Sequence, residues 1–285
     1  MVEKQTRLHH ALFLLRSAYD SCLQHNQLNN AAALSFFFLL SLSPLLIFLV
    51  SLMALLPVPQ LDRHIVEAVA QIVPVDAMKV VGRLLMSIFE TNRRLLSLGI
   101  VGAIWSASTG FNAMIVSLNS AYRVKEARPL WRRQLVATGL TIVVGAMVLL
   151  AMFLLFLGAQ VGHWLALQVG MESALAVAWP YIRWVVVVGF TTLSVEVLYF
   201  LAPNVKQRFL AQIPGATLAV ALWLASSFGL GLYLHSFSEF TAIYGTLGAM
   251  IALMLWVYVS SLAILIGAEV NAQIIQEKSA AQMSC

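Results

Sequence analysis

Residues 30–56 read NAAALSFFFLLSLSPLLIFLVSLMALL, an apolar run without a charged side chain. About 20 apolar residues in a helix are enough to cross about 30 Å of hydrocarbon. The backbone of such a helix forms its own hydrogen bonds, which lipid cannot provide. This stretch therefore predicts a membrane-spanning helix.

The rest of the chain has the same character. Of its 285 residues, 61% are hydrophobic and only 10% are charged, and the mean hydropathy is +0.88. A soluble domain carries about 25% charged residues because its surface faces water. The composition excludes a soluble globule of this size and predicts an all-α, polytopic membrane helix bundle.

Six apolar stretches are long enough to span a membrane, and we expect them to form a single integral membrane domain over residues 1–285. They cover residues 30–56, 95–122, 135–161, 181–202, 210–234 and 243–270. Two more polar stretches, about 8–22 and 61–92, carry an apolar stripe at helical spacing. We expect them to form amphipathic helices at the membrane interface. Residues 162–180 are expected to form an outer loop.

Basic residues indicate the orientation. With the N-terminus inside, eleven Lys and Arg lie in cytoplasmic segments and five lie in the first outer loop. Cytoplasmic loops usually carry the excess of basic residues. Although the first outer loop opposes this rule, the alternation favours a bacterial inner-membrane protein with both termini in the cytoplasm. The net charge of +5 therefore needs no nucleic-acid partner.

The second expected span has two faces when it is wound at 100° per residue. Apolar residues, among them Ile115, Leu118 and Ala121, fill one arc, and we expect that arc to face lipid. Small and polar residues fill the rest. Small residues let membrane helices pack closely, which is one interpretation of that face. The other is that Asn112 and Asn119 line a hydrated cavity.

Glu196 is the most informative single residue because it lies inside the fourth expected span. A carboxylate in hydrocarbon is costly, so it should face the bundle and be paired or protonated. Thr192 and Tyr199 share its helical face, and the three form a candidate cavity or substrate site. A hydrogen-bonded structural acid is the alternative. We expect Glu269, near the inner end of the sixth span, to lie at the interface.

Proline and glycine mark candidate hinge or packing positions. Pro44 removes one helix hydrogen bond within the first span and should kink it. Gly245 and Gly248 cost about 1 kcal/mol each in a helix, which suggests close packing at the outer end of the sixth span. The expected neighbour is the second span, along Gly102 and Ser106. The remaining candidates of this kind are Pro203 and Tyr244.

Sequence motifs of catalysis are missing. The chain has no phosphate-binding loop, no HExxH, no paired CxxC and no GxSxG. Its six histidines are scattered along the sequence and predict no metal site. We therefore expect no enzyme activity, no cofactor and no metal.

Three stretches together resemble one family. They are AAALS running into SLSPLL (31–46), WSAS through Asn112 and Asn119 to AYR (105–123), and IYG through Gly248 and Trp256 to GAE (243–269). Pro203-Asn204 and Pro214-Gly215-Ala216 fall between them as expected. The chain is similar to the YihY/BrkB family over about residues 10–275. The resemblance implies a six-helix inner-membrane protein without an agreed molecular function. Some relatives carry a ribonuclease BN label, which this sequence does not support.

Two functions remain open. The first is transport or flipping of a lipid-like or amphipathic molecule, favoured by the polar face of the second span, Glu196 and Pro44. The second is a non-catalytic subunit or scaffold of an envelope complex, with an envelope protein as partner. The amphipathic outer loop favours the second.

Overall fold

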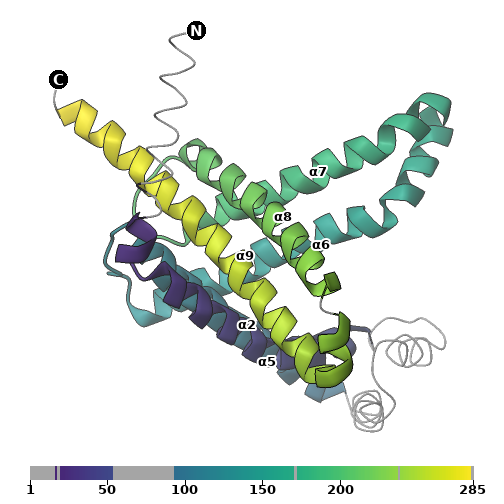
Figure 1. The fold of residues 1–285 in the computed structure, drawn as a ribbon, viewed down its shortest axis with the longest axis horizontal. Helices are drawn as coiled ribbons and strands as arrows, with labels where there is room; N and C mark the ends of the chain where they lie inside the picture. The colour runs from purple at the N-terminus through teal and green to yellow at the C-terminus, as the bar shows by residue number, and fades with distance from the viewer. Residues whose placement is uncertain (1–16, 18–19, 54–92, 170–171, 237, 284–285) are drawn as a thin grey trace. The chain divides into compact units, whose positions relative to one another are not determined.

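The computed structural model describes residues 17, 20–53, 93–169, 172–236 and 238–283 (Figure 1). Every regular element in these residues is a helix. The elements are α2 (Gln27–Met53), α5 (Arg93–Ala121), α6 (Leu130–Val169), α7 (Glu172–Leu201), the short 3-10 helix η1 (Phe209–Gln212), α8 (Ile213–Ser236) and α9 (Ser238–Met283). The expected all-α membrane bundle is confirmed.

Four segments of the described residues are long and apolar enough to span a membrane. They are Leu130–Ala151, Tyr181–Leu201, Phe209–Tyr233 and Met250–Glu277, and they match the third to sixth expected spans. The first and second expected spans coincide with α2 and α5. The total of six spans stays a prediction. Most of the amphipathic helix expected over 8–22, and all of that over 61–92, lies outside the described residues.

The outer loop expected over residues 162–180 is largely helical, and its position outside the membrane stays a prediction. Helix α6 continues to Val169 and α7 begins at Glu172, so nearly all of this stretch is helical. The stretch is rich in Ala and Leu, which favour helices in or out of lipid. At 1.5 Å per residue, the 40 residues of α6 rise about 60 Å, about twice the thickness of the hydrocarbon.

The chain divides into two compact units. One comprises Met1–Phe36 and Phe111–Cys285, and the other comprises Phe37–Gly110. The boundaries fall inside α2 and α5. All contacts described below lie within the first unit.

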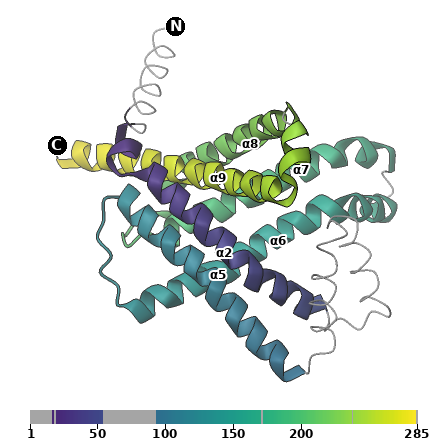
Figure 2. The ribbon, with the colours of Figure 1, turned by 60° about the horizontal axis from the view of Figure 1, so that its bottom comes forward.

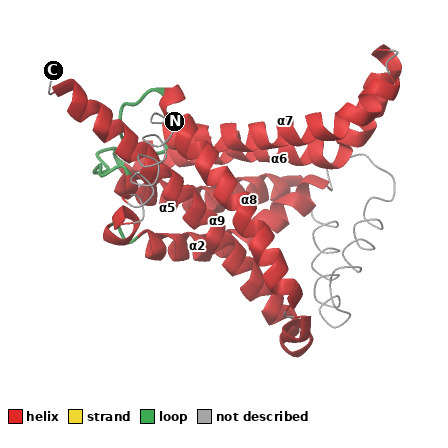
Figure 3. Cartoon of the chain, turned by 45° about the horizontal axis from the view of Figure 1, so that its top comes forward, coloured by secondary structure: helices red, strands yellow, loops and turns green. Residues whose placement is uncertain are grey.

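Within this unit, α6 pairs with α7, α8 pairs with α9, and α7 also contacts α8 (Figure 2). The described loops gather at one end of these helices (Figure 3). The buried core contains many small side chains, which let membrane helices approach closely. Its fully buried members include Ala31, Ile115, Leu118, Ala121, Ala137, Tyr199, Ala216, Leu265 and Ala268.

The expectation that the apolar arc of α5 faces lipid is wrong at its C-terminal end. Ile115, Leu118 and Ala121 are fully buried in the core, whereas Val116 is 51% exposed. An apolar side chain gains little from lipid over a protein neighbour, so apolarity alone does not select the lipid-facing side.

Helices α8 and α9 cross at a pair of glycines. A Cβ on Gly215 would lie 2.2 Å from the carbonyl oxygen of Gly267, and a Cβ on Gly267 would lie 2.4 Å from that of Gly215. Both distances are far below van der Waals contact. Only glycine fits at either position.

Candidate functional site

Glu196 lies in α7 and is buried, as its position inside a span predicts. Its residue exposure is 6%, and the described residues provide no hydrogen-bond partner for its Oε1. Thr192 does not supply one, because its hydroxyl donates to the carbonyl of Val188 one turn earlier. Glu196 is thus a buried carboxylate with an open acceptor.

The other candidate cavity residues have partners of their own. Tyr199 is fully buried, and its hydroxyl donates to the carbonyl of Ile264 on α9. The amide of Asn112 donates to Gln134 Oε1 over 2.6 Å, while the Oδ1 of Asn112 is buried without a partner among the described residues. Tyr199 therefore locks two helices together, and a cavity role for Asn112 stays a prediction.

Asn119 joins two loops. Its amide donates to Glu126 Oε2 over 2.8 Å, and its Oδ1 accepts from the backbone N–H of Asn204 over 2.8 Å. Pro203, beside Asn204, is buried. These contacts give Asn119 a structural role in the described part of the chain.

The hinge and packing candidates are only partly described. Helix α2 runs through Pro44 and α9 runs through Tyr244 and Gly245, and Gly248 is buried. Gly102 and Ser106 belong to the second compact unit. The predicted contact between these two groups stays a prediction, as does the kink at Pro44.

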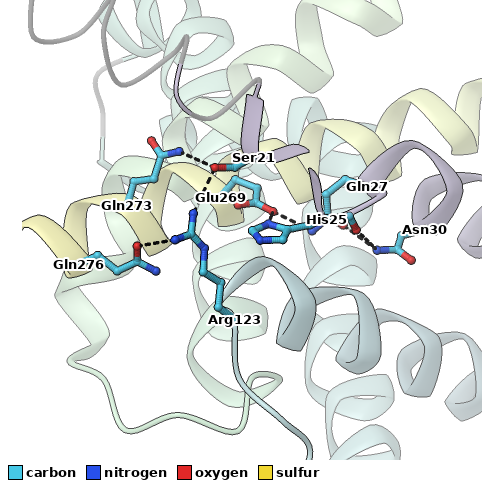
Figure 4. Close-up of polar contacts among 8 residues, drawn as sticks. All are labelled: Ser21, His25, Gln27, Asn30, Arg123, Glu269, Gln273 and Gln276. Carbon is cyan, nitrogen blue, oxygen red and sulfur yellow. Dashed lines mark hydrogen bonds and ion pairs between the residues drawn. The ribbon is translucent and has the colours of Figure 1, made fainter. Parts of the chain in front are cut away.

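A second buried carboxylate is Glu269 on α9, shown in Figure 4. It is fully buried, and its Oε1 accepts from Gln27 Nε2 over 2.9 Å. His25 Nδ1 lies 2.8 Å from the same oxygen and donates to it in the tautomer that carries a proton on Nδ1. Asn30 Nδ2 donates to Gln27 Oε1 over 2.9 Å. The residues before and at the start of α2 cover Glu269, and its expected depth at the membrane interface stays a prediction.

Arg123 extends this network at the end of α5. Its guanidinium donates to Gln276 Oε1 over 3.0 Å and to Ser21 Oγ over 3.3 Å. Gln273 Nε2 donates to the same hydroxyl over 3.2 Å. Arg123 has a φ of 57°, a left-handed conformation that ends the helix and turns the chain into the next loop. The segment before α2, the end of α5 and the end of α9 are therefore held together by side chains.

Cys22 lies beside this network and is a buried free thiol. Burial, followed by the nearby carboxylate of Glu269, raises the pKa of Cys22 to about 12. Because the thiolate is the reactive form, this cysteine is a weak nucleophile at neutral pH.

A second polar group lies where η1 leads into α8. The hydroxyl of Tyr122 donates to Gln212 Oε1 over 2.6 Å. Asn271 donates to the carbonyl of Gln212 over 2.9 Å and accepts from the backbone N–H of Gly215 over 2.8 Å. Asn271 therefore satisfies the backbone N–H of Gly215, one of the donors that the first turn of α8 leaves open.

Glu126 organises the loop between α5 and α6. Its Oε1 lies 2.8 Å from Arg128 Nε, and Arg128 Nη2 donates to the carbonyl of Ala202 over 2.6 Å. The hydrogen bond from Arg128, together with those from its backbone and from Asn119, lowers the pKa of Glu126 to about 2. The carboxylate is ionised at any physiological pH.

The Glu269 network was not predictable from the sequence, because its partners lie about 240 residues apart in the chain. The available signals were a glutamate in an apolar run and the polar string from His25 to Asn30. A buried carboxylate beside an imidazole can hold or exchange a proton. The described residues contain no group of three His, Cys, Asp or Glu side chains that could hold a metal ion.

Comparisons with known proteins agree with the fold. The model of the family described as virulence factor BrkB matches residues 18–284. The ribonuclease-like protein YfkH of Bacillus subtilis (strain 168) is 35% identical over 93% of this chain and 96% of its own length. A UPF0761 membrane protein of Aeromonas salmonicida (strain A449) is 27% identical over 93% of both chains.

The UPF0761 membrane protein RSc1559 of Ralstonia nicotianae is 28% identical over 85% of this chain but only 54% of its own length. No solved structure matches the chain. The family match covers both ends of the Glu269 network and all four described candidate spans. The chain belongs to the BrkB family of membrane proteins.

Proposed function

We propose that this protein transports or flips a lipid-like, amphipathic molecule across the bacterial inner membrane, and that Glu196 is the polar group inside the membrane that the substrate or a proton engages. The observation that carries the proposal is the buried Oε1 of Glu196, which has no partner among the described residues. An unsatisfied buried polar group costs about 1–3 kcal/mol. Ionisable groups within spans are commonly functional for this reason.

The orientation that we propose places both termini in the cytoplasm. The described loops at the end where α5 meets α6 and α7 meets η1 carry the basic residues, which supports a cytoplasmic position for that end. Reporter fusions after Arg133 and after Arg208 should give cytoplasmic signals, and a fusion at Ser238 should give an external one. A cytoplasmic signal at Ser238 would contradict this orientation.

Transport is tested with purified protein in liposomes. The probes are phosphatidylglycerol and phosphatidylethanolamine with a fluorescent label on one acyl chain, and the readout is the rate at which an impermeant reductant bleaches the inner-leaflet label. Wild-type protein should speed movement of a probe over empty liposomes. Glu196→Gln should lower that rate by about tenfold or more, because the amide cannot carry a proton or a negative charge.

The matched control is Glu277→Gln, which removes one carboxylate at an exposed position of α9. It should transport as wild type does. If neither lipid moves and a partner protein co-purifies stably from the membrane, the scaffold role is the correct one. If Glu196→Gln transports at the wild-type rate, Glu196 is not the site.

A further inference from the structure

We propose that the loop between α5 and α6 and the connection between α7 and η1 form a single basic face that binds the headgroups of anionic phospholipids in the surrounding bilayer. The face comprises residues 123–133 and 202–208. It is separate from Glu196, so the inference stands or falls independently of the transport function.

The two segments are joined into one surface by hydrogen bonds. Arg128 Nη2 donates to the carbonyl of Ala202 over 2.6 Å. Asn204 donates from its backbone to Asn119 Oδ1 over 2.8 Å and from its side chain to the carbonyl of Lys125 over 3.4 Å. Residues that are about 80 positions apart in the sequence therefore lie side by side. Figure 3 shows these loops at the same end of the helices.

The face is strongly positive. Its two segments contain seven basic residues and one acidic residue, Glu126. Glu126 is already paired with Arg128. The other six basic residues have no acid in either segment to neutralise them, and they are Arg123, Lys125, Arg132, Arg133, Lys206 and Arg208.

Several of these groups are available to a ligand. Lys125, Arg132, Lys206 and Arg208 are exposed. Arg133 is half-buried, and its Nε is buried without a partner among the described residues. Exposed ammonium and guanidinium groups form charge-assisted hydrogen bonds with phosphate oxygens.

Exposed apolar side chains border the basic residues. Leu130 is 76% exposed and Trp131 is 65% exposed, directly before Arg132. Leu210 is 73% exposed, two residues after Arg208. Two candidate spans begin here, at Leu130 and at Phe209. The basic side chains therefore lie at the depth where these spans would enter the hydrocarbon, and Trp131 lies beside them, as is common for tryptophan at a membrane interface.

This combination favours a lipid over a nucleic acid as the ligand. A nucleic acid would approach from water and gain nothing from the leucines at the rim. A phospholipid would place its phosphate against the basic side chains and its acyl chains against Leu130, Trp131 and Leu210. Basic residues at the membrane surface attract anionic lipids in this way.

The test uses the full-length protein in nanodiscs of phosphatidylcholine. A small fraction of the lipid is replaced by a brominated lipid, either phosphatidylglycerol or phosphatidylcholine. The bromine atoms on its acyl chains quench the fluorescence of nearby tryptophan. Wild-type protein should be quenched more by brominated phosphatidylglycerol. Trp131→Phe should abolish the extra quenching by brominated phosphatidylglycerol. That result would locate the bound lipid at the basic face.

The decisive variant is Arg132→Gln with Lys206→Gln and Arg208→Gln. Each surface charge changes the affinity by about fivefold, so removing three should lower the preference by about a hundredfold. The control removes the same charge elsewhere, through Arg83→Gln, Arg93→Gln and Arg94→Gln, and should keep the preference. The charge-preserving set Arg132→Lys, Lys206→Arg and Arg208→Lys should keep it too.

Four results would overturn the proposal. They are an equal quenching by both brominated lipids in the wild type, an unchanged preference in the neutral variant, an equal loss in the control, and displacement of phosphatidylglycerol by a short RNA. If the neutral variant does not fold, the wild type still decides. Its preference must weaken as NaCl is raised, and a preference that salt leaves unchanged is not electrostatic.

Discussion

Glu196 and Glu269 are both buried carboxylates in long apolar helices, but their surroundings differ. The Oε1 of Glu269 has two partners, His25 just before α2 and Gln27 at its start, while the Oε2 of Glu269 is buried without a partner among the described residues. The Oε1 of Glu196 has no partner among the described residues. A buried carboxylate oxygen with donors stabilises the packing of its helix, whereas one without donors lowers stability.

The helices around the two residues differ in the same way. Two residues before Glu269, Gly267 touches the backbone of α8 so closely that no Cβ fits. Seven residues before Glu196, Gly189 has nothing within 4 Å of a Cβ position. The Glu269 region is tightly packed, and α7 is open near Gly189. The predictions below test this difference through stability, measured by SDS titration in mixed micelles.

The largest effect is expected from Gly267→Ala. The new Cβ would lie 2.4 Å from the carbonyl oxygen of Gly215 and 2.6 Å from the hydroxyl of Tyr199, so α8 and α9 must separate. We expect a loss of about 3 kcal/mol or more, at the upper end of overpacking effects. Gly189→Ala is the control and should change stability by no more than about 1 kcal/mol. Equal effects at both glycines would remove the distinction between the two regions.

Glu269→Leu should follow in size. The change leaves Gln27 Nε2 buried without its acceptor, at a cost of about 1–3 kcal/mol. Glu269→Gln keeps an oxygen in the same place and should lose less. Labelling of Cys22 by a maleimide gives a second readout, since opening of the network exposes this thiol. Slow labelling in Glu269→Leu would show that the segment before α2 is held by other contacts.

Glu126 extends the comparison to a carboxylate outside the membrane with several partners. Its pKa in the folded protein is lowered from 4.5 to about 2, so its stabilising contribution is complete above about pH 4.5 and is lost as the pH falls towards 2. We expect on the order of 2 kcal/mol. The stability difference between wild type and Glu126→Gln should therefore shrink on acidification. A difference that is constant from pH 7 to pH 3 would contradict the lowered pKa.

The smallest effect is expected from Glu196→Leu. Replacement of an unpartnered buried carboxylate by an apolar side chain removes a desolvation cost and no described hydrogen bond, so stability should stay within about 0.5 kcal/mol or rise. The informative result is the contrast with Glu269→Leu. If both leucine variants are equally unstable, Glu196 is a structural acid, and the transport proposal loses its main support.

The helices were predictable from the sequence because each span must satisfy its own backbone. The bounds of α2 and α5 agree with the expected spans to within a few residues where both are described. The helices within residues 162–180 were not predicted, because hydropathy indicates which residues fit the bilayer and not where a helix ends. Helices α6 and α7 continue well beyond the length that lipid requires.

The contacts of the site were not predictable. Asn119, Tyr199 and Glu269 are polar residues in apolar runs, and a single sequence does not say which other helix supplies their partners. The burial of Ile115 and Leu118 was not predictable either, since an apolar side chain fits equally well against lipid and against an apolar protein neighbour. The burial of Glu196 was predictable because its signal, a charge inside an apolar run, is local.

The hydrogen bond between Gln27 and Glu269 also bears on how the protein is made, because the two residues are 242 positions apart. At about 5–20 residues per second, the ribosome needs roughly 12–50 seconds to reach Glu269 after Gln27 has been synthesised. During this interval Gln27, at the start of α2, cannot form its hydrogen bond with Glu269. Helix α2 is therefore without this partner until the part of α9 that carries Glu269 has been synthesised.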